Sequence, residues 1–90
     1  MILIVDDDNA VRMSVSLALN RAGFEPWAVA GEEDALAAAR DERVELVILD
    51  MNLTLSTTGR QGIEMLRKIR VSGFFRWVGK VSEYSVIFAK

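Results

Sequence analysis

The chain has no cysteine and no histidine among its 90 residues. Without cysteine, disulfides and thiolate metal sites are excluded. Without histidine, the commonest transition-metal ligand and the usual general base are missing as well. The chemistry that remains belongs to carboxylates, hydroxyls, amides, lysine and arginine. Any functional site in this sequence must therefore be built from those groups.

Long hydrophobic runs are missing too, since the first apolar stretch already breaks at Asp6 and no later one approaches the length of a membrane span. The N-terminus also lacks the basic segment of a secretory signal peptide. We therefore expect a cytoplasmic protein that does not enter a membrane. The composition, 51% hydrophobic and 27% charged, is that of a globular domain. The length predicts a single domain over residues 1–90, with a thin core.

The charges are unevenly distributed, although the net charge is only -2. Acidic residues dominate as far as Glu64, whereas the stretch that follows carries more cations than acids. These cations are Arg67, Lys68, Arg70, Arg76, Lys80 and Lys90. Such an asymmetry is a reason to consider an anionic partner, but a solvated basic face is the commoner cause of a charge run. Direct binding of nucleic acid is not expected.

Short apolar segments at residues 2–5, 24–30 and 44–49 predict three β-strands. Pro26 has no N–H to donate to a neighbouring strand, so the second strand is expected at an edge of the sheet or to start at Pro26. The first and third segments are continuous apolar runs, which is typical of strands that are buried on both faces.

Three segments with apolar residues at helical spacing separate or follow these strands. The first segment follows Asp8, a predicted N-cap, and ends before Gly23, where a left-handed residue is favoured. The second begins at Gly31, and its first turn is acidic, which the helix dipole favours. The third has one apolar face, which is formed by Ile63, Leu66 and Ile69.

The alternation of strands and helices predicts an α/β fold, with a flavodoxin-like parallel sheet in 2-1-3 order and helices on both faces. After Val71 the pattern weakens, with a strand predicted at 84–89 and a less certain one at 77–81. Residues 72–90 are thus an atypical tail in place of a second half. Its aromatic residues are expected to cover the sheet or to join two copies in a homodimer. They are Phe74, Phe75, Trp77, Tyr84 and Phe88.

Acidic residues lie at the carboxyl ends of two predicted strands. Asp6 and Asp7 follow the first strand, and Asp50 follows the third. If these strands are neighbours, their carboxylates meet at one sheet edge, where they repel one another unless a cation is bound. Oxygen ligands without histidine or cysteine favour Mg²⁺, with Asp50 as a ligand and a nucleophile. The alternative is that residues 6–8 only cap a helix and Asp50 only begins a polar loop.

Four segments together resemble a bacterial response regulator receiver domain of two-component signalling: ILIVDDD, GEEDALAAAR, LVILDMNL and GIEMLRKIR. The resemblance covers about residues 2–71 and implies a CheY-like phosphoacceptor that takes a phosphoryl group from a sensor histidine kinase with Mg²⁺. It implies that Asp50 accepts the phosphoryl group, that Asp7 and Asp50 bind the metal directly, that Asp6 holds it through water, and that Asn52 contributes its backbone carbonyl. Such a module is not an enzyme, apart from slow autodephosphorylation at most.

The family also has a switch Ser or Thr and a Lys after its later strands, and neither can be assigned here. Ser82, Ser85, Lys80 and Lys90 have suitable side chains, but the residues around them match no family motif. Each is interpreted as an ordinary surface residue.

Two other functions remain open. The chain could be a degenerate receiver that serves only as an interaction or dimerisation scaffold. It could also be a Mg²⁺-dependent phosphohydrolase with an aspartyl-phosphate intermediate, for which Asp6 and Asp8 supply the Asp-x-Asp pair, although no Thr follows. A dinucleotide-binding fold is less favoured, because the first turn lacks a glycine-rich loop.

Overall fold

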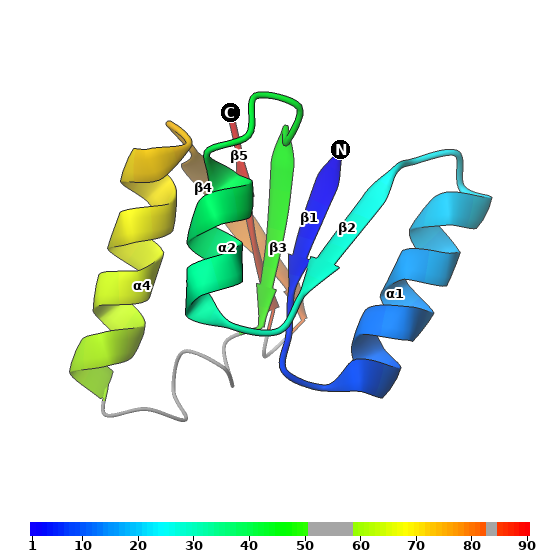
Figure 1. Ribbon diagram of the computed structural model, residues 1–90, viewed down its shortest axis with the longest axis horizontal. Coiled ribbons are helices and arrows are strands. Elements are labelled where there is room, and N and C mark those ends of the chain that lie inside the picture. Colours follow the sequence, from blue (N-terminus) through cyan, green and yellow to red (C-terminus); the bar gives the residue numbers. More distant parts are fainter. Residues whose placement is uncertain (51–58, 83–84) are drawn as a thin grey trace.

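The computed structural model describes residues 1–50, 59–82 and 85–90 (Figure 1). The described residues form a five-stranded sheet and three helices. In chain order the elements are β1 (Ile2–Val5), α1 (Asn9–Arg21), β2 (Pro26–Val29), α2 (Glu32–Ala39), β3 (Leu46–Asp50), α4 (Gly59–Ser72), β4 (Arg76–Ser82) and β5 (Ser85–Ala89).

The strand order is β2-β1-β3-β5-β4, in which β1 pairs in parallel with both β2 and β3. On β1, for example, Ile4 lies opposite Ala28 of β2 and opposite Ile48 of β3. The predicted 2-1-3 order and the flavodoxin-like class are therefore confirmed. β2 lies at an edge of the sheet and begins at Pro26, as the missing N–H predicts.

Residues 76–82 and 85–89 of the tail form the two remaining strands, which complete the same sheet. β5 pairs antiparallel with both β3 and β4. The physical reason is the connection: two residues separate β4 from β5, whereas a parallel return needs a crossover of a dozen residues or more. The strand expected at 84–89 is present from Ser85, and Tyr84 lies outside the described residues.

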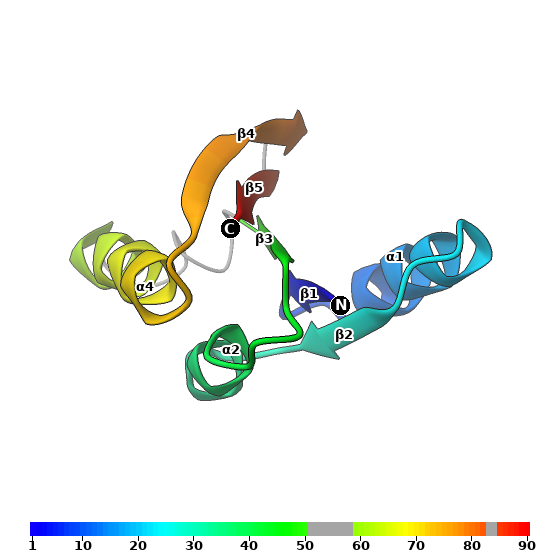
Figure 2. The same cartoon turned by 90° about the horizontal axis from the view of Figure 1, so that it is seen from above.

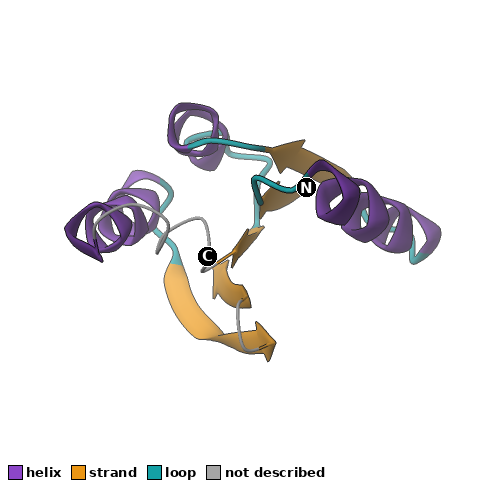
Figure 3. Ribbon diagram, turned by 90° about the horizontal axis from the view of Figure 1, so that it is seen from below, coloured by secondary structure: helices purple, strands orange, loops and turns teal. Residues whose placement is uncertain are grey.

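The helices cover both faces of the sheet, as predicted. Figures 2 and 3 show α2 and α4 on one face and α1 on the other. The main core lies on the face of α2 and α4, and its buried members include Leu3, Leu49, Ile69, Phe75 and Phe88. No residue of α1 is fully buried. None of the described helices has the length and apolar character needed to span a membrane.

Both predicted ends of α1 are confirmed. The carboxylate of Asp8 accepts hydrogen bonds from the backbone N–H groups of Ala10 (2.8 Å) and Val11 (3.3 Å), so Asp8 is the N-cap. Gly23 follows the helix with a φ of +90°, a conformation that side chains with a Cβ rarely adopt. Asp8 thereby fixes the short connection between β1 and α1, and Gly23 marks the turn between α1 and β2.

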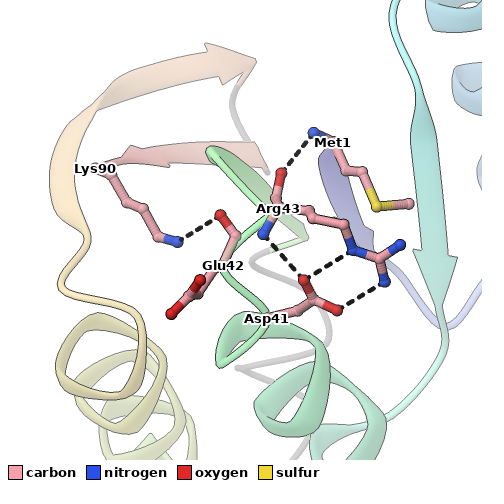
Figure 4. Close-up of polar contacts among 5 residues, drawn as sticks. All are labelled: Met1, Asp41, Glu42, Arg43 and Lys90. Carbon is pink, nitrogen blue, oxygen red and sulfur yellow. Dashed lines mark hydrogen bonds and ion pairs between the residues drawn. The ribbon is translucent and has the colours of Figure 1, made fainter.

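The amino edge of the sheet is tied together by polar contacts with the α2–β3 connection (Figure 4). The N-terminal amine of Met1 donates to the carbonyl of Arg43 at 2.7 Å. The Arg43 guanidinium donates to both carboxylate oxygens of Asp41, at 3.0 and 2.8 Å. Lys90 Nζ donates to the carbonyl of Glu42 at 3.4 Å. Both termini are therefore held at the end of the sheet opposite Asp50.

The Asp41→Asn variant should lose stability in a pH-dependent way. Hydrogen bonds from the side chain and backbone of Arg43 lower the pKa of Asp41 from 3.8 to about 2. Because the folded-state pKa lies below the unfolded value, this stabilisation is present above about pH 4 and disappears as the pH falls through about 2. The urea midpoint of the variant should be lower at pH 7, by a small amount because the pair is exposed, and should converge with that of the unaltered chain near pH 2. A constant difference would contradict this explanation.

Candidate functional site

Three carboxylates meet at the carboxyl edge of the sheet. Asp6 and Asp7 directly follow β1, and Asp50 is the last residue of β3. One oxygen atom from each of these residues lies within 4.8 Å of the other two. The cluster exists because β1 and β3 are parallel neighbours in register, with Val5 opposite Leu49. The sequence therefore placed these three residues together correctly.

Asp6 is the buried member of the cluster, with 8% of its surface exposed. Its Oδ1 accepts a hydrogen bond from the backbone N–H of Asp8 at 2.9 Å. Burial raises the pKa of Asp6 above 3.8, and the charges of Asp50, Asp7 and Asp8 raise it further, while the bond from the Asp8 N–H opposes them. Asp6 thus lies in surroundings that favour neutralisation of its charge.

Asp7 is the exposed member of the cluster, whereas Asp50 is half-buried. The donor set consists of carboxylate oxygens, which hard cations such as Mg²⁺ prefer. The residues present therefore fit a magnesium ion. Asn52, the remaining predicted ligand, lies outside the described residues.

Arg12 is a residue near the cluster that sequence reasoning missed. Its Nη1 donates to the backbone carbonyl of Asp6 at 2.8 Å, and its Nη2 donates to Oδ1 of Asn9 at 3.2 Å. The side chain thus ties the start of α1 to the end of β1 and orients the backbone that carries Asp6 and Asp7. The sequence contains one indication of this role. A cation near a helix N-terminus is unfavourable because it opposes the helix dipole, so an arginine at position 12 suggests a compensating contact.

The hydroxyl and lysine residues that the sequence left unassigned are now placed by register. Ser85, the first residue of β5, lies directly opposite Asp50 of β3. Lys80 of β4 is paired with Val86, the residue that directly follows Ser85 on β5. Lys90 lies at the opposite edge of the sheet, where its Nζ is 5.5 Å from the centroid of the Phe75 ring. Of these three residues, only Ser85 is placed beside Asp50.

Comparisons with known proteins identify relatives of this chain. Residues 2–80 match the family model of the response regulator receiver domain. The chain is 36% identical over 69 residues to the transcriptional regulatory protein AfsQ1 of Streptomyces coelicolor. The aligned residues make up 77% of this chain and 29% of that protein. The chain is also 36% identical over 70 residues to sporulation initiation phosphotransferase F of Bacillus subtilis. This alignment covers 78% of this chain and 53% of that protein.

A third relative is the phosphate regulon transcriptional regulatory protein PhoB of Pseudomonas aeruginosa. It is 35% identical over 69 residues, which cover 77% of this chain and 28% of that protein. The matched segment thus spans between about a quarter and a half of the length of these three relatives. No solved structure matches the chain.

Proposed function

Because the chain belongs to the response regulator receiver domain family, we propose that it is a phosphoacceptor module of a two-component phosphorelay. In this role Asp50 takes a phosphoryl group from a phosphohistidine of a sensor histidine kinase. The observation that carries the proposal is the meeting of Asp6, Asp7 and Asp50 at the carboxyl edge of the sheet, within 4.8 Å of one another. Three carboxylates so close together are costly unless they serve a cation or a reaction.

The residues of the cluster have different proposed roles. Asp7 and Asp50 bind Mg²⁺ directly, Asp6 holds it through water, and Asn52 contributes its backbone carbonyl. When bound, the ion neutralises charge on the transferring phosphoryl group. A carboxylate oxygen of Asp50 forms a bond to phosphorus while the phosphorus–nitrogen bond of the donor breaks, and the electron pair stays with the imidazole nitrogen. The chain is then an acceptor and not an enzyme acting on other molecules, although slow autodephosphorylation is compatible with the site.

The proposal is tested with the purified chain, Mg²⁺ and acetyl phosphate, which replaces the kinase as a small phosphodonor. Intact-mass spectrometry should show the gain of one phosphoryl group. Chelation of the metal by EDTA should abolish the gain, and an excess of Mg²⁺ should restore it, because the three carboxylates repel an incoming phosphoryl group when no cation is present. Failure to gain a phosphoryl group with Mg²⁺ present would reject the proposed function.

A scaffold function is the second candidate, and one observation favours it. Several large apolar side chains between residues 71 and 81 are exposed: Val71, Phe74, Trp77, Val78 and Val81. A cluster of exposed apolar residues in one stretch of chain is typical of an interaction surface. We propose that this stretch joins two copies of the chain in a homodimer.

The homodimer predicts a concentration-dependent sedimentation coefficient at tens of micromolar. The double variant Phe74→Ser, Trp77→Ser should sediment as a monomer, because it removes two exposed aromatic side chains, which are 87% and 58% exposed, while the core is left intact. The matched control is Met13→Ser, which removes a 65% exposed apolar side chain on α1 and should leave association unchanged. A chain that is strictly monomeric at this concentration would exclude the homodimer.

A further inference from the structure

We propose that Arg12 raises the affinity of the carboxylate cluster for Mg²⁺ by holding the backbone that carries Asp7, although the charge of its own guanidinium repels the ion. Arg12 is thus a positioning residue, which acts on the site through hydrogen bonds to its neighbours. The inference rests on the metal site of the proposed function, in which Asp7 binds Mg²⁺ directly, and extends that site to a residue of α1.

The place of the Asp7 carboxylate in the cluster depends on its backbone. Asp7 is exposed, and none of the hydrogen bonds among the described residues involves its carboxylate. The residue before it is held firmly: Asp6 donates its backbone N–H to the carbonyl of Val29 at 3.1 Å, and its Oδ1 accepts from the N–H of Asp8 at 2.9 Å. The position of Asp7 is therefore set by the two peptide groups that join it to Asp6 and Asp8.

Arg12 holds the first of these peptide groups. Its Nη1 donates to the carbonyl of Asp6 at 2.8 Å, while its Nη2 is anchored on Oδ1 of Asn9 at 3.2 Å. The arginine reaches back from a helix that begins at the same edge of the sheet as the cluster (Figure 1), and its own N–H donates to the carbonyl of Asp8 at 3.0 Å. Because the peptide group is planar, a fixed Asp6 carbonyl also fixes the direction in which the chain continues into Asp7.

The charge of Arg12 acts against metal binding, so its hydrogen bonds are the part that can favour it. A positive charge near the cluster repels a cation, and the N-terminal part of α1 disfavours a cation as well. Removing a residue that orients metal ligands by hydrogen bonds typically weakens metal binding by roughly 10–100-fold. Screening by solvent and salt keeps the opposing effect of one charge smaller. The balance therefore favours tighter binding when the arginine is present.

The sign of the change in Mg²⁺ affinity separates the two effects of Arg12. If the arginine acted by its charge alone, Arg12→Met would bind Mg²⁺ more tightly, because a repelling charge is gone. The positioning role predicts the opposite, namely that Arg12→Met binds Mg²⁺ about tenfold more weakly than the unaltered chain. Isothermal titration calorimetry of the unphosphorylated chain with Mg²⁺, at constant ionic strength, measures this affinity without any phosphodonor.

Two further variants isolate the geometry from the charge. Asn9→Ala leaves every charge unchanged but removes the acceptor that anchors Nη2 of Arg12, and it should weaken Mg²⁺ binding about threefold. Arg21→Met, the control, makes the same change as Arg12→Met at an exposed position at the other end of α1, and it should leave the affinity unchanged. Far-UV circular dichroism shows whether each variant is folded. If Arg12→Met does not fold, Asn9→Ala decides between the two roles.

Each outcome has a defined meaning. Weaker Mg²⁺ binding in Arg12→Met and in Asn9→Ala, with Arg21→Met unchanged, supports the positioning role. Tighter or unchanged binding in Arg12→Met overturns it, as does unchanged binding in Asn9→Ala or an equal loss in Arg21→Met. A chain that shows the supporting pattern but takes no phosphoryl group rejects the proposed phosphoacceptor function and keeps the role of Arg12 in metal binding. A chain that binds no Mg²⁺ rejects both.

Discussion

The Asp50→Asn variant is expected to take no phosphoryl group from acetyl phosphate under conditions in which the unaltered chain takes one. The amide of asparagine has nearly the same shape as the carboxyl group but lacks the anionic oxygen that attacks phosphorus. The substitution also removes one of three negative charges from the cluster and so weakens metal binding. Both effects act in the same direction, so the expected loss is complete. Intact-mass spectrometry measures it directly.

Asp41→Asn is the matched control for this experiment. It makes the same chemical change at the opposite edge of the sheet, where Asp41 contacts Arg43 and not the cluster. The control should be phosphorylated as well as the unaltered chain. Phosphorylation that persists in Asp50→Asn would show that another residue accepts the phosphoryl group, and the assignment of Asp50 would then be wrong.

The Gly73→Ala variant should be strongly destabilising, although it adds only one methyl group. Gly73 is buried after α4, and a Cβ at this position would come within 2.0–2.4 Å of two ring atoms of Phe75 and 2.6 Å of the carbonyl oxygen of Ala39. The ring of Phe75 is itself only 2% exposed, and the carbonyl belongs to the backbone of α2. Because neither neighbour can move freely, we expect a loss of about 3 kcal/mol of unfolding free energy.

Urea denaturation at pH 7 measures this loss, which is a large part of the roughly 5–15 kcal/mol that holds a typical domain together. The control is Gly79→Ala on β4, where a Cβ would meet nothing within 4 Å. That variant should unfold within about 0.5 kcal/mol of the unaltered chain. Equal midpoints for the two variants would contradict the close packing of Gly73 between α2 and Phe75.

Much of the fold could be predicted because the signals for it are local. The apolar run at 2–5 and the cap at Asp8 determine β1 and the start of α1 by short-range preferences. The missing N–H of Pro26 likewise predicts an edge position or a strand start, and β2 has both. The tail was harder, because the two strands were recognised but their direction and their order in the sheet depend on pairing with β3, which is distant in sequence.

The cluster of carboxylates was predictable for a general reason: parallel neighbours end at the same edge of a sheet, so Asp6, Asp7 and Asp50 had to meet once the 2-1-3 order was assumed. Arg12 was missed because its contact with the end of β1 is to the backbone carbonyl of Asp6, and a backbone acceptor is not encoded by any particular side chain. The sequence alone does not place Ser85 at the site, since its position opposite Asp50 follows from an antiparallel register and not from a family motif.

The central prediction is that Asp6, Asp7 and Asp50 together bind Mg²⁺ and that Asp50 accepts the phosphoryl group. The most direct measurement is a crystal structure of the chain with Mg²⁺ and beryllofluoride, which mimics a phosphoryl group on an aspartate. We predict an ion about 2.0–2.1 Å from carboxylate oxygens of Asp7 and Asp50, with beryllofluoride bonded to Asp50. An ion bound away from these residues, or beryllofluoride on a different side chain, would contradict the proposal that the acidic tips of β1 and β3 form one phosphoacceptor site.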